Sequence, residues 1–260
     1  MLIIDNNIDF GNVGTVLGYN ELSPNKGILA WSRDIENEIA RRKRERDPNP
    51  DNINYTWDEI QRYLYIQERS GLYALLPPTN NADTFDISTR ALEIMADNVI
   101  HNAGFDYVVF DTGNNTRDSS IIPITMSDYV LLVLTQSIQT VECSESALKT
   151  VSDIGVNVKD KFYTVINMTS NKSGISSDDI KASLLDPDTK SPLDCLAEIK
   201  NDDRVTYAHN NEECMVYDPG SDFAKKIGLI ADFVTKRTSV LQVPEKKGFL
   251  AKLLPSIFGK

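Results

Sequence analysis

The chain has 260 residues, of which 41% are hydrophobic and 25% charged, and its formal net charge is −11. This composition is typical of a folded globular protein and excludes a disordered chain. The acidic excess argues against non-specific DNA binding over the whole surface. Three cysteines and two histidines argue against a disulfide framework and a histidine-rich metal site.

The order of apolar runs and amphipathic segments predicts alternating strands and helices. We expect strands at 1–4, 71–76, 107–110, 129–134 and 162–166, with a weak last strand at 196–199. We expect helices at 31–47, from Thr56 through Leu64 and Tyr65, at 86–103, and near 137–154, 176–186 and 221–239. This alternation predicts an α/β fold whose mainly parallel sheet is sandwiched by helices, over residues 1–240.

Three of these strands end in a polar residue: Asp5, Asp111 and Asn167. In sheets of this kind, ligands bind beyond the carboxyl ends of the strands. One buried acid at a strand end is commonly a cap, but three polar strand ends in one chain are more informative. Carboxylate oxygens suit a hydrated magnesium ion, so we expect a Mg²⁺ site near Asp111.

Five segments carry a family resemblance. Residues 4–12 resemble the D-x-D-x-x-F-G-N segment of the MinD/ParA superfamily of deviant P-loop ATPases, and 105–112 resemble its F-D-Y-V-V-I-D-T strand. Residues 127–133, 165–168 and 202–210 resemble later elements in the same order, so the resemblance covers nearly the whole chain. Within the superfamily, the chain looks closest to the CpaE and TadZ branch, which is involved in pilus assembly.

The resemblance implies a P-loop NTPase, or AAA, domain that binds ATP and Mg²⁺ and dimerises around the nucleotide. In that scheme Asp111 holds Mg²⁺ through water, and Asn167 recognises adenine with Asp202 on the same side. The catalytic positions are Asp5, Asn7 and Asp9. Asn7 replaces the family's usual second acid, so hydrolysis is slow or absent unless Asp9 substitutes for it.

The glycine-rich loop G-x-x-x-x-G-K-[ST], which cradles phosphates in this superfamily, does not occur in the sequence. We therefore expect this chain alone to bind ATP poorly or not at all. Either the chain is a true pseudo-ATPase, or it is a fragment lacking the family's first strand and P-loop. Unpaired buried N–H and C=O groups beside a missing central strand favour the fragment.

The last residues form a separate segment. Residues 241–245 look like a tether, and 246–260 resemble the membrane-targeting tail of MinD, with the same K-G-F-L core. Apolar residues Phe249, Leu250, Leu253, Leu254, Ile257 and Phe258 form one helical stripe, beside the cations Lys246, Lys247 and Lys252. This pattern predicts binding to an anionic membrane surface, although docking on the chain's own domain or on a partner stays open.

Together these features predict a cytoplasmic, peripherally membrane-bound positioning ATPase of pilus or secretion-machine assembly, acting as a homodimer with an unidentified protein partner. The alternative is a non-catalytic scaffold that localises such a machine without ATP turnover. Specific nucleic-acid binding is disfavoured by the net charge. The basic run at 41–46 is interpreted as a solvated helix end rather than a patch for an acidic partner, and Arg117 as a surface ion pair rather than a phosphate contact.

Overall fold

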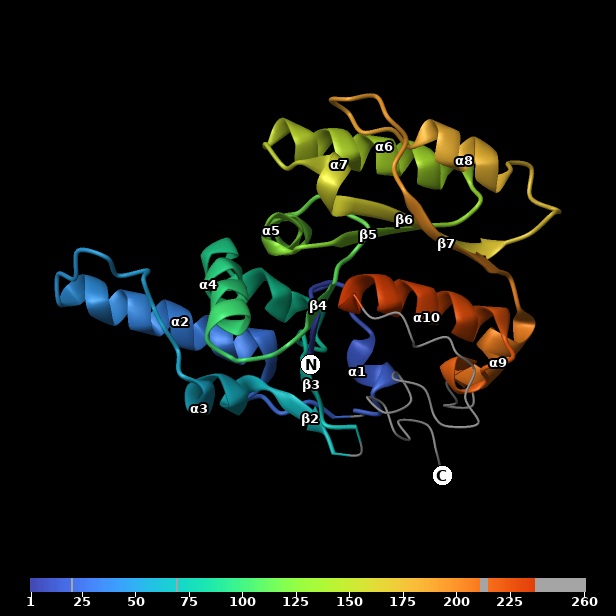
Figure 1. Ribbon diagram of the computed structural model, residues 1–260. Helices are drawn as coiled ribbons and strands as arrows, with labels where there is room; N and C mark the ends of the chain where they lie inside the picture. Colours follow the sequence, from blue (N-terminus) through green and yellow to red (C-terminus); the bar gives the residue numbers. More distant parts are fainter. Residues whose placement is uncertain (20, 69, 211–214, 237–260) are drawn as a thin grey trace. The chain divides into compact units, whose positions relative to one another are not determined.

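The computed structural model describes residues 1–19, 21–68, 70–210 and 215–236, and divides the chain into two compact units that meet in sequence between Met126 and Ser127 (Figure 1). Each unit contains a sheet of mainly parallel strands with helices packed against it. The predicted fold class is therefore confirmed. The predicted tether and tail, 241–260, lie outside the described residues.

The first unit is built on a four-stranded sheet in the order β2-β3-β1-β4. Its strands are β1 (Leu2–Asp5), β2 (Tyr65–Gln67), β3 (Leu72–Leu75) and β4 (Val108–Asp111). Its helices are α1 (Val13–Val16), α2 (Gly27–Arg44), α3 (Trp57–Ile60), α4 (Thr89–His101) and α5 (Asp118–Met126), with 3₁₀ turns η1 (Gln61–Tyr63) and η2 (Asn81–Asp86). β1 pairs in parallel with both β3 and β4, which makes it an interior strand, whereas β2 is an antiparallel edge strand.

The core of this unit lies between the sheet and two helices. The large apolar residues buried by α2 recur every three or four positions and so share one face of the helix; they are Ile28, Trp31, Ile35 and Ile39. They pack in one cluster with Leu2 and Ile4 of β1 and with the buried face of α4. Burial of this face, rather than helix propensity, holds the two helices on the sheet.

The second unit contains a three-stranded parallel sheet in the order β5-β6-β7, with β5 (Val130–Leu134), β6 (Phe162–Thr169) and β7 (Cys195–Lys200). Its helices are α6 (Ile138–Asp153), α7 (Val158–Lys161), α8 (Ser177–Ser183), α9 (Asp203–Asn210) and α10 (Asp222–Thr235), and η3 spans Met215–Tyr217. α10 lays Phe223, Ile227 and Ile230 against a buried patch of β6 and β7.

Two predicted elements differ from the structure. The helix beginning at Thr56 has the expected capping box, in which the Thr56 N–H donates to Glu59 at 2.8 Å, but it ends at Ile60. Tyr65 starts β2 instead, because it pairs with Ala74 of β3. β6 also continues past Asn167 to Thr169, through a register shift against β7. Both differences depend on pairing with a distant strand, Tyr65 with Ala74 and Thr169 with Lys200, which a local sequence pattern does not contain.

None of the described helices combines the length and the hydropathy needed to cross a bilayer.

Asn98 ties the loop before α3 to α4. Its side chain is 1% exposed, accepts a hydrogen bond from the Tyr55 N–H at 2.7 Å and donates to the Ile53 carbonyl at 2.9 Å. Asn98→Ala leaves both backbone groups unpaired, so we expect the free energy of unfolding to fall by about 2–4 kcal/mol. Urea denaturation measures this, with the exposed Asn54→Ala as a control expected to change it by less than about 0.5 kcal/mol. Equal effects of the two substitutions would contradict this role for Asn98.

Candidate functional site at the carboxyl edge of β1 and β4

The two acidic strand ends of the first unit lie side by side. In the parallel pairing of β1 with β4, Asp5 is in register with Asp111. Since parallel strands end at the same edge of a sheet, the loops after them, residues 6–12 and 112–117, start from neighbouring points. The structure therefore brings Asp5 and Asp111 together and places Asn7 and Asp9 on the loop that follows β1.

Asp5 is fully buried, at 0% exposure. Its Oδ2 accepts a hydrogen bond from the Val13 N–H at 3.0 Å, whereas its Oδ1 makes no hydrogen bond of ordinary geometry with the described residues. Burial raises the pKa of Asp5 to about 6 and the nearby charge of Asp111 adds to this, while the backbone N–H groups of Val13 and Asn7 act in the opposite direction. Partial desolvation also raises the pKa of Asp111. A positive charge at this edge would therefore stabilise the ionised form of each carboxylate.

Gly11 is the glycine that this arrangement requires. A Cβ at position 11 would lie 2.4 Å from Oδ2 of Asp5, well inside van der Waals contact. The loop after β1 therefore passes directly over the buried carboxylate and can do so only without a side chain. Sequence reasoning assigned no role to Gly11, although the F-G-N part of its segment contained the signal.

The loops after β1 and β4 are also joined to each other. The Asn6 N–H donates to the Asp111 carbonyl at 2.7 Å, and Asn6 Nδ2 donates to the Ser119 carbonyl at 2.8 Å. A Cβ at Gly113 would lie 2.8 Å from Asn7 Oδ1, so the Asn7 amide rests against the backbone of the second loop. Asn6 is 4% exposed and was not among the predicted site residues, although it follows the same strand end as Asp5.

Asp9 is engaged by two other segments. Its carboxylate accepts a hydrogen bond from Arg117 at 2.6 Å and from the Thr84 hydroxyl at 3.4 Å. The Arg117 side chain is 69% exposed, so this is the surface ion pair that the sequence analysis favoured. In this arrangement the carboxylate of Asp9 is held by Arg117 and Thr84.

The remaining predicted site residues, Asn167 and Asp202, belong to the second unit. Asn167 Oδ1 accepts a hydrogen bond from the N–H of Met168, which has a φ of 55° and a side chain exposed to solvent. Asp202 is ion-paired with Arg204 at 2.6 Å, and this hydrogen bond lowers the pKa of Asp202. The adjoining ends of β6 and β7 carry these residues, since Thr169 pairs with Lys200.

The chemistry of the β1–β4 edge suits a hard cation. Mg²⁺ is bound in proteins through one or two carboxylates and keeps several waters, and Asp5 and Asp111 offer that donor set, with one buried oxygen unpartnered. Among the described residues there is no group of three or more Asp, Glu, His or Cys side chains that could hold a metal ion, so this edge offers only the two carboxylates. Phosphates need donors or cations as well, and the cation recorded beside this edge, Arg117, is already paired with Asp9.

We expect Asp5 to make stability depend on pH. An unfolded aspartate titrates near 3.9 and the folded Asp5 near 6, so its contribution is present in full below about pH 4 and is lost as the pH rises through 6. The two-unit difference corresponds to about 3 kcal/mol. Urea denaturation in EDTA should show the wild type losing about this much relative to Asp5→Asn between pH 4 and 7.5. Parallel profiles for the two proteins would show that Asp5 is not desolvated in the folded state.

Comparison with solved structures identifies the fold. A ParA family ATPase from Chlorobium tepidum TLS is 16% identical with a TM-score of 0.65, covering 90% of this chain and 84% of that one. The septum site-determining protein MinD from Pyrococcus horikoshii OT3, solved with Mg-ADP, is 14% identical with a TM-score of 0.64, covering 90% and 83%. MinD in a MinC:MinD cell division complex from Aquifex aeolicus is 15% identical with a TM-score of 0.60, covering 95% and 86%.

Neither a protein-family model nor a curated protein sequence matches the chain. The three likenesses given above are at 14–16% identity, and what they establish is the fold. The chain has the α/β fold of the MinD and ParA ATPases, as the motif order in its sequence predicted.

Proposed function

We propose that the protein is a nucleotide-dependent positioning protein of the MinD/ParA kind, with a Mg²⁺–ATP site at the carboxyl edge of β1 and β4. The observation that carries this proposal is the in-register pair Asp5 and Asp111, with the buried, unpartnered Oδ1 of Asp5. The same fold was solved with Mg-ADP in the Pyrococcus horikoshii MinD. In this proposal Asp111 holds the water shell of Mg²⁺, and Asp5 supports the loop after β1. Asn167 recognises adenine, and Asp202 contributes to the same nucleotide contacts.

The site has few groups that could bind phosphate. Phosphates need backbone N–H groups or a lysine, and no G-x-x-x-x-G-K-[ST] segment occurs in the sequence. The cation recorded beside this edge, Arg117, is paired with Asp9. We therefore expect the 260 residues alone to hold Mg²⁺ better than the triphosphate.

Calorimetric titration of Mg-ATP into the 260-residue chain tests this expectation. Without a lysine-bearing phosphate loop, the triphosphate has too few donors, so we expect no dissociation constant in the micromolar range. The Asp111→Asn variant is the matched control. A micromolar constant that Asp111→Asn abolishes would show that these residues build a complete nucleotide site themselves, contrary to the expectation. A micromolar constant that Asp111→Asn leaves unchanged would place the nucleotide elsewhere and overturn the proposed site.

A second candidate function is a non-catalytic scaffold that localises a membrane machine without ATP turnover. Asn7 favours it, because an amide cannot accept the proton of the attacking water, and Asp9 is held by Arg117 and Thr84. Phosphate release in the presence of Mg-ATP separates the two functions. Turnover by the wild type would exclude the scaffold, whereas turnover by Asn7→Asp alone would place the block at Asn7.

We further propose that residues 246–260 attach the protein peripherally to the cytoplasmic face of a membrane, in pilus or secretion-machine localisation with a protein partner. The supporting feature is the apolar stripe flanked by lysines. One such helix binds weakly, and a nucleotide-dependent homodimer would present two and gain avidity. With a net charge of −11, specific nucleic-acid binding is not part of this proposal.

Deletion of 246–260 should abolish co-sedimentation with liposomes that contain anionic lipid, because the stripe and its lysines are removed together. A variant with Leu253→Glu and Leu254→Glu keeps the length and tests the apolar stripe directly. Sedimentation of the deletion variant at the wild-type level would mean that another surface binds the membrane.

A further inference from the structure

The end of α2 extends beyond the core of the first unit. The last buried residue of the helix is Ile39, and the segment that follows contains five cations, Arg41, Arg42, Lys43, Arg44 and Arg46, within six positions. Cations are favourable at a helix C-terminus, where the backbone carbonyls accumulate negative charge. The question is whether all five serve the helix itself.

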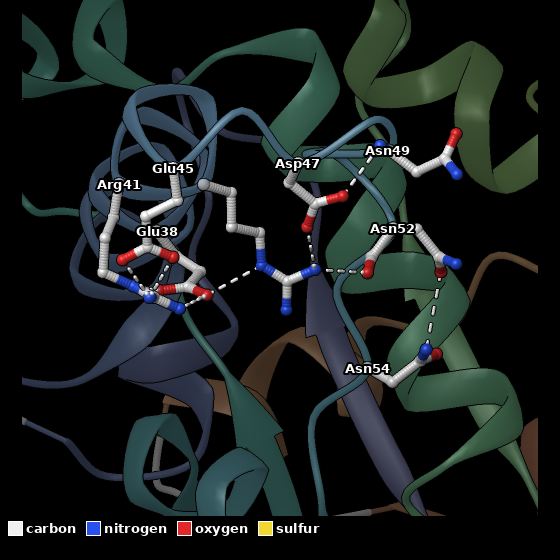
Figure 2. Close-up of polar contacts among 8 residues, drawn as sticks. Glu38, Arg41, Glu45, Asp47, Asn49, Asn52 and Asn54 are labelled. Carbon is white, nitrogen blue, oxygen red and sulfur yellow. Dashed lines mark hydrogen bonds and ion pairs between the residues drawn. The ribbon is translucent and has the colours of Figure 1, made fainter.

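Two of the five are fully engaged within the chain (Figure 2). Arg41 forms ion pairs with Glu38 and Glu45, both at 2.7 Å. Arg42 donates to Glu38 at 2.8 Å and to the Asn52 carbonyl at 2.8 Å, and lies 3.7 Å from Asp47. The hydrogen bonds from both arginines lower the pKa of Glu38 to about 2. Arg41 and Arg42 therefore pair with the nearby carboxylates Glu38, Glu45 and Asp47, which carry one negative charge more than the two arginines balance.

The other three cations, Lys43, Arg44 and Arg46, are exposed and have no carboxylate partner in the described part of the chain. We call these three residues the α2 basic patch. The five cations of residues 41–46 outnumber the three acids paired with them, so a positive charge remains at this helix end, even though the whole chain carries −11.

Arg46 adds an independent observation. Its φ is 61°, its N–H donates to the Lys43 carbonyl at 3.1 Å, and the Asp47 N–H donates to the Arg42 carbonyl at 3.0 Å. This is the Schellman pattern of a helix end, in which the left-handed position is usually glycine. A side chain with a Cβ is unfavourable in that conformation. The chain thus places a cation where glycine would be more stable, which is a common property of functional positions.

The sequence alone favoured a solvated helix end here, but the unpaired cations support another role. We propose that the α2 basic patch binds an acidic segment of a partner protein, a run of Asp and Glu residues whose carboxylates would pair with the three cations. A nucleic-acid duplex carries one charge per about 1.7 Å, a far higher charge density than three cations at one helix end can neutralise. The net charge of −11 repels a long polyanion, which extends over much of the surface. A short acidic segment contacts only the positively charged helix end.

Fluorescence anisotropy tests the proposal with two labelled probes, a 12-residue peptide with glutamate at alternate positions and a 20-base-pair DNA duplex. The test variant is Lys43→Gln, Arg44→Gln and Arg46→Gln. Its matched control is Lys149→Gln, Lys172→Gln and Lys225→Gln, which removes three exposed cations elsewhere. We expect the test variant to weaken peptide binding at least tenfold and the control to change it less than twofold. Absence of peptide binding, equal losses in both variants, or tighter binding of the duplex would overturn the proposal.

Arg46→Gly gives a second readout that loss of folding cannot imitate. Glycine relieves the left-handed backbone, so we expect the melting temperature to rise by about 2–4 °C while the affinity for the peptide falls. A lower melting temperature, or an unchanged affinity, would show that Arg46 is not kept for binding.

Discussion

The pairing of β1 with strands on both of its sides is the constraint on which the first unit depends. β1 contributes Leu2 and Ile4 to the core beneath α2, and the same register leaves Asp5 buried beside Asp111. A shift of one residue would turn the apolar side chains away from the core. The apolar register therefore also fixes the position of the buried carboxylate, and the glycine at position 11 and the hydrogen bonds of Asn6 are adaptations to it.

Burial of Asp5 without a full set of hydrogen bonds is a local cost, and it links stability to binding. An ionised carboxylate away from water is unfavourable unless it is paired, and the raised pKa of Asp5 reflects that. A cation at this edge would favour the ionised forms of both Asp5 and Asp111. Any ligand that binds the folded state in this way also stabilises it. Cation binding at this edge would therefore be coupled to the ionisation of Asp5 and to the stability of the first unit.

Much of the fold could be predicted from local sequence patterns, and each exception has a physical cause. The apolar runs ending at Asp5 and Asp111 became β1 and β4, and the capping box at Thr56 formed as expected. β2 was missed because three residues at a sheet edge carry little pattern of their own. α5 was missed because it contains Pro123 and no clear polar face. In the site, Asp5 and Asp111 were predicted, but the contact between Asp9 and Arg117 joins positions 108 residues apart, which spacing alone cannot reveal.

The two binding proposals rest on the same physical reasoning, applied once to a buried carboxylate and once to an exposed cation. At the β1–β4 edge the chain keeps a buried acid with an unpartnered oxygen, and at the end of α2 it keeps an exposed cation on a left-handed backbone. Each is locally unfavourable, and a neutral or smaller residue would remove the cost. Most side chains around them are satisfied, as the ion pairs of Arg41 and Arg42 show. When most of a structure is locally consistent, the few positions that are not are where a missing partner is best sought, a cation for Asp5 and a carboxylate for Arg46.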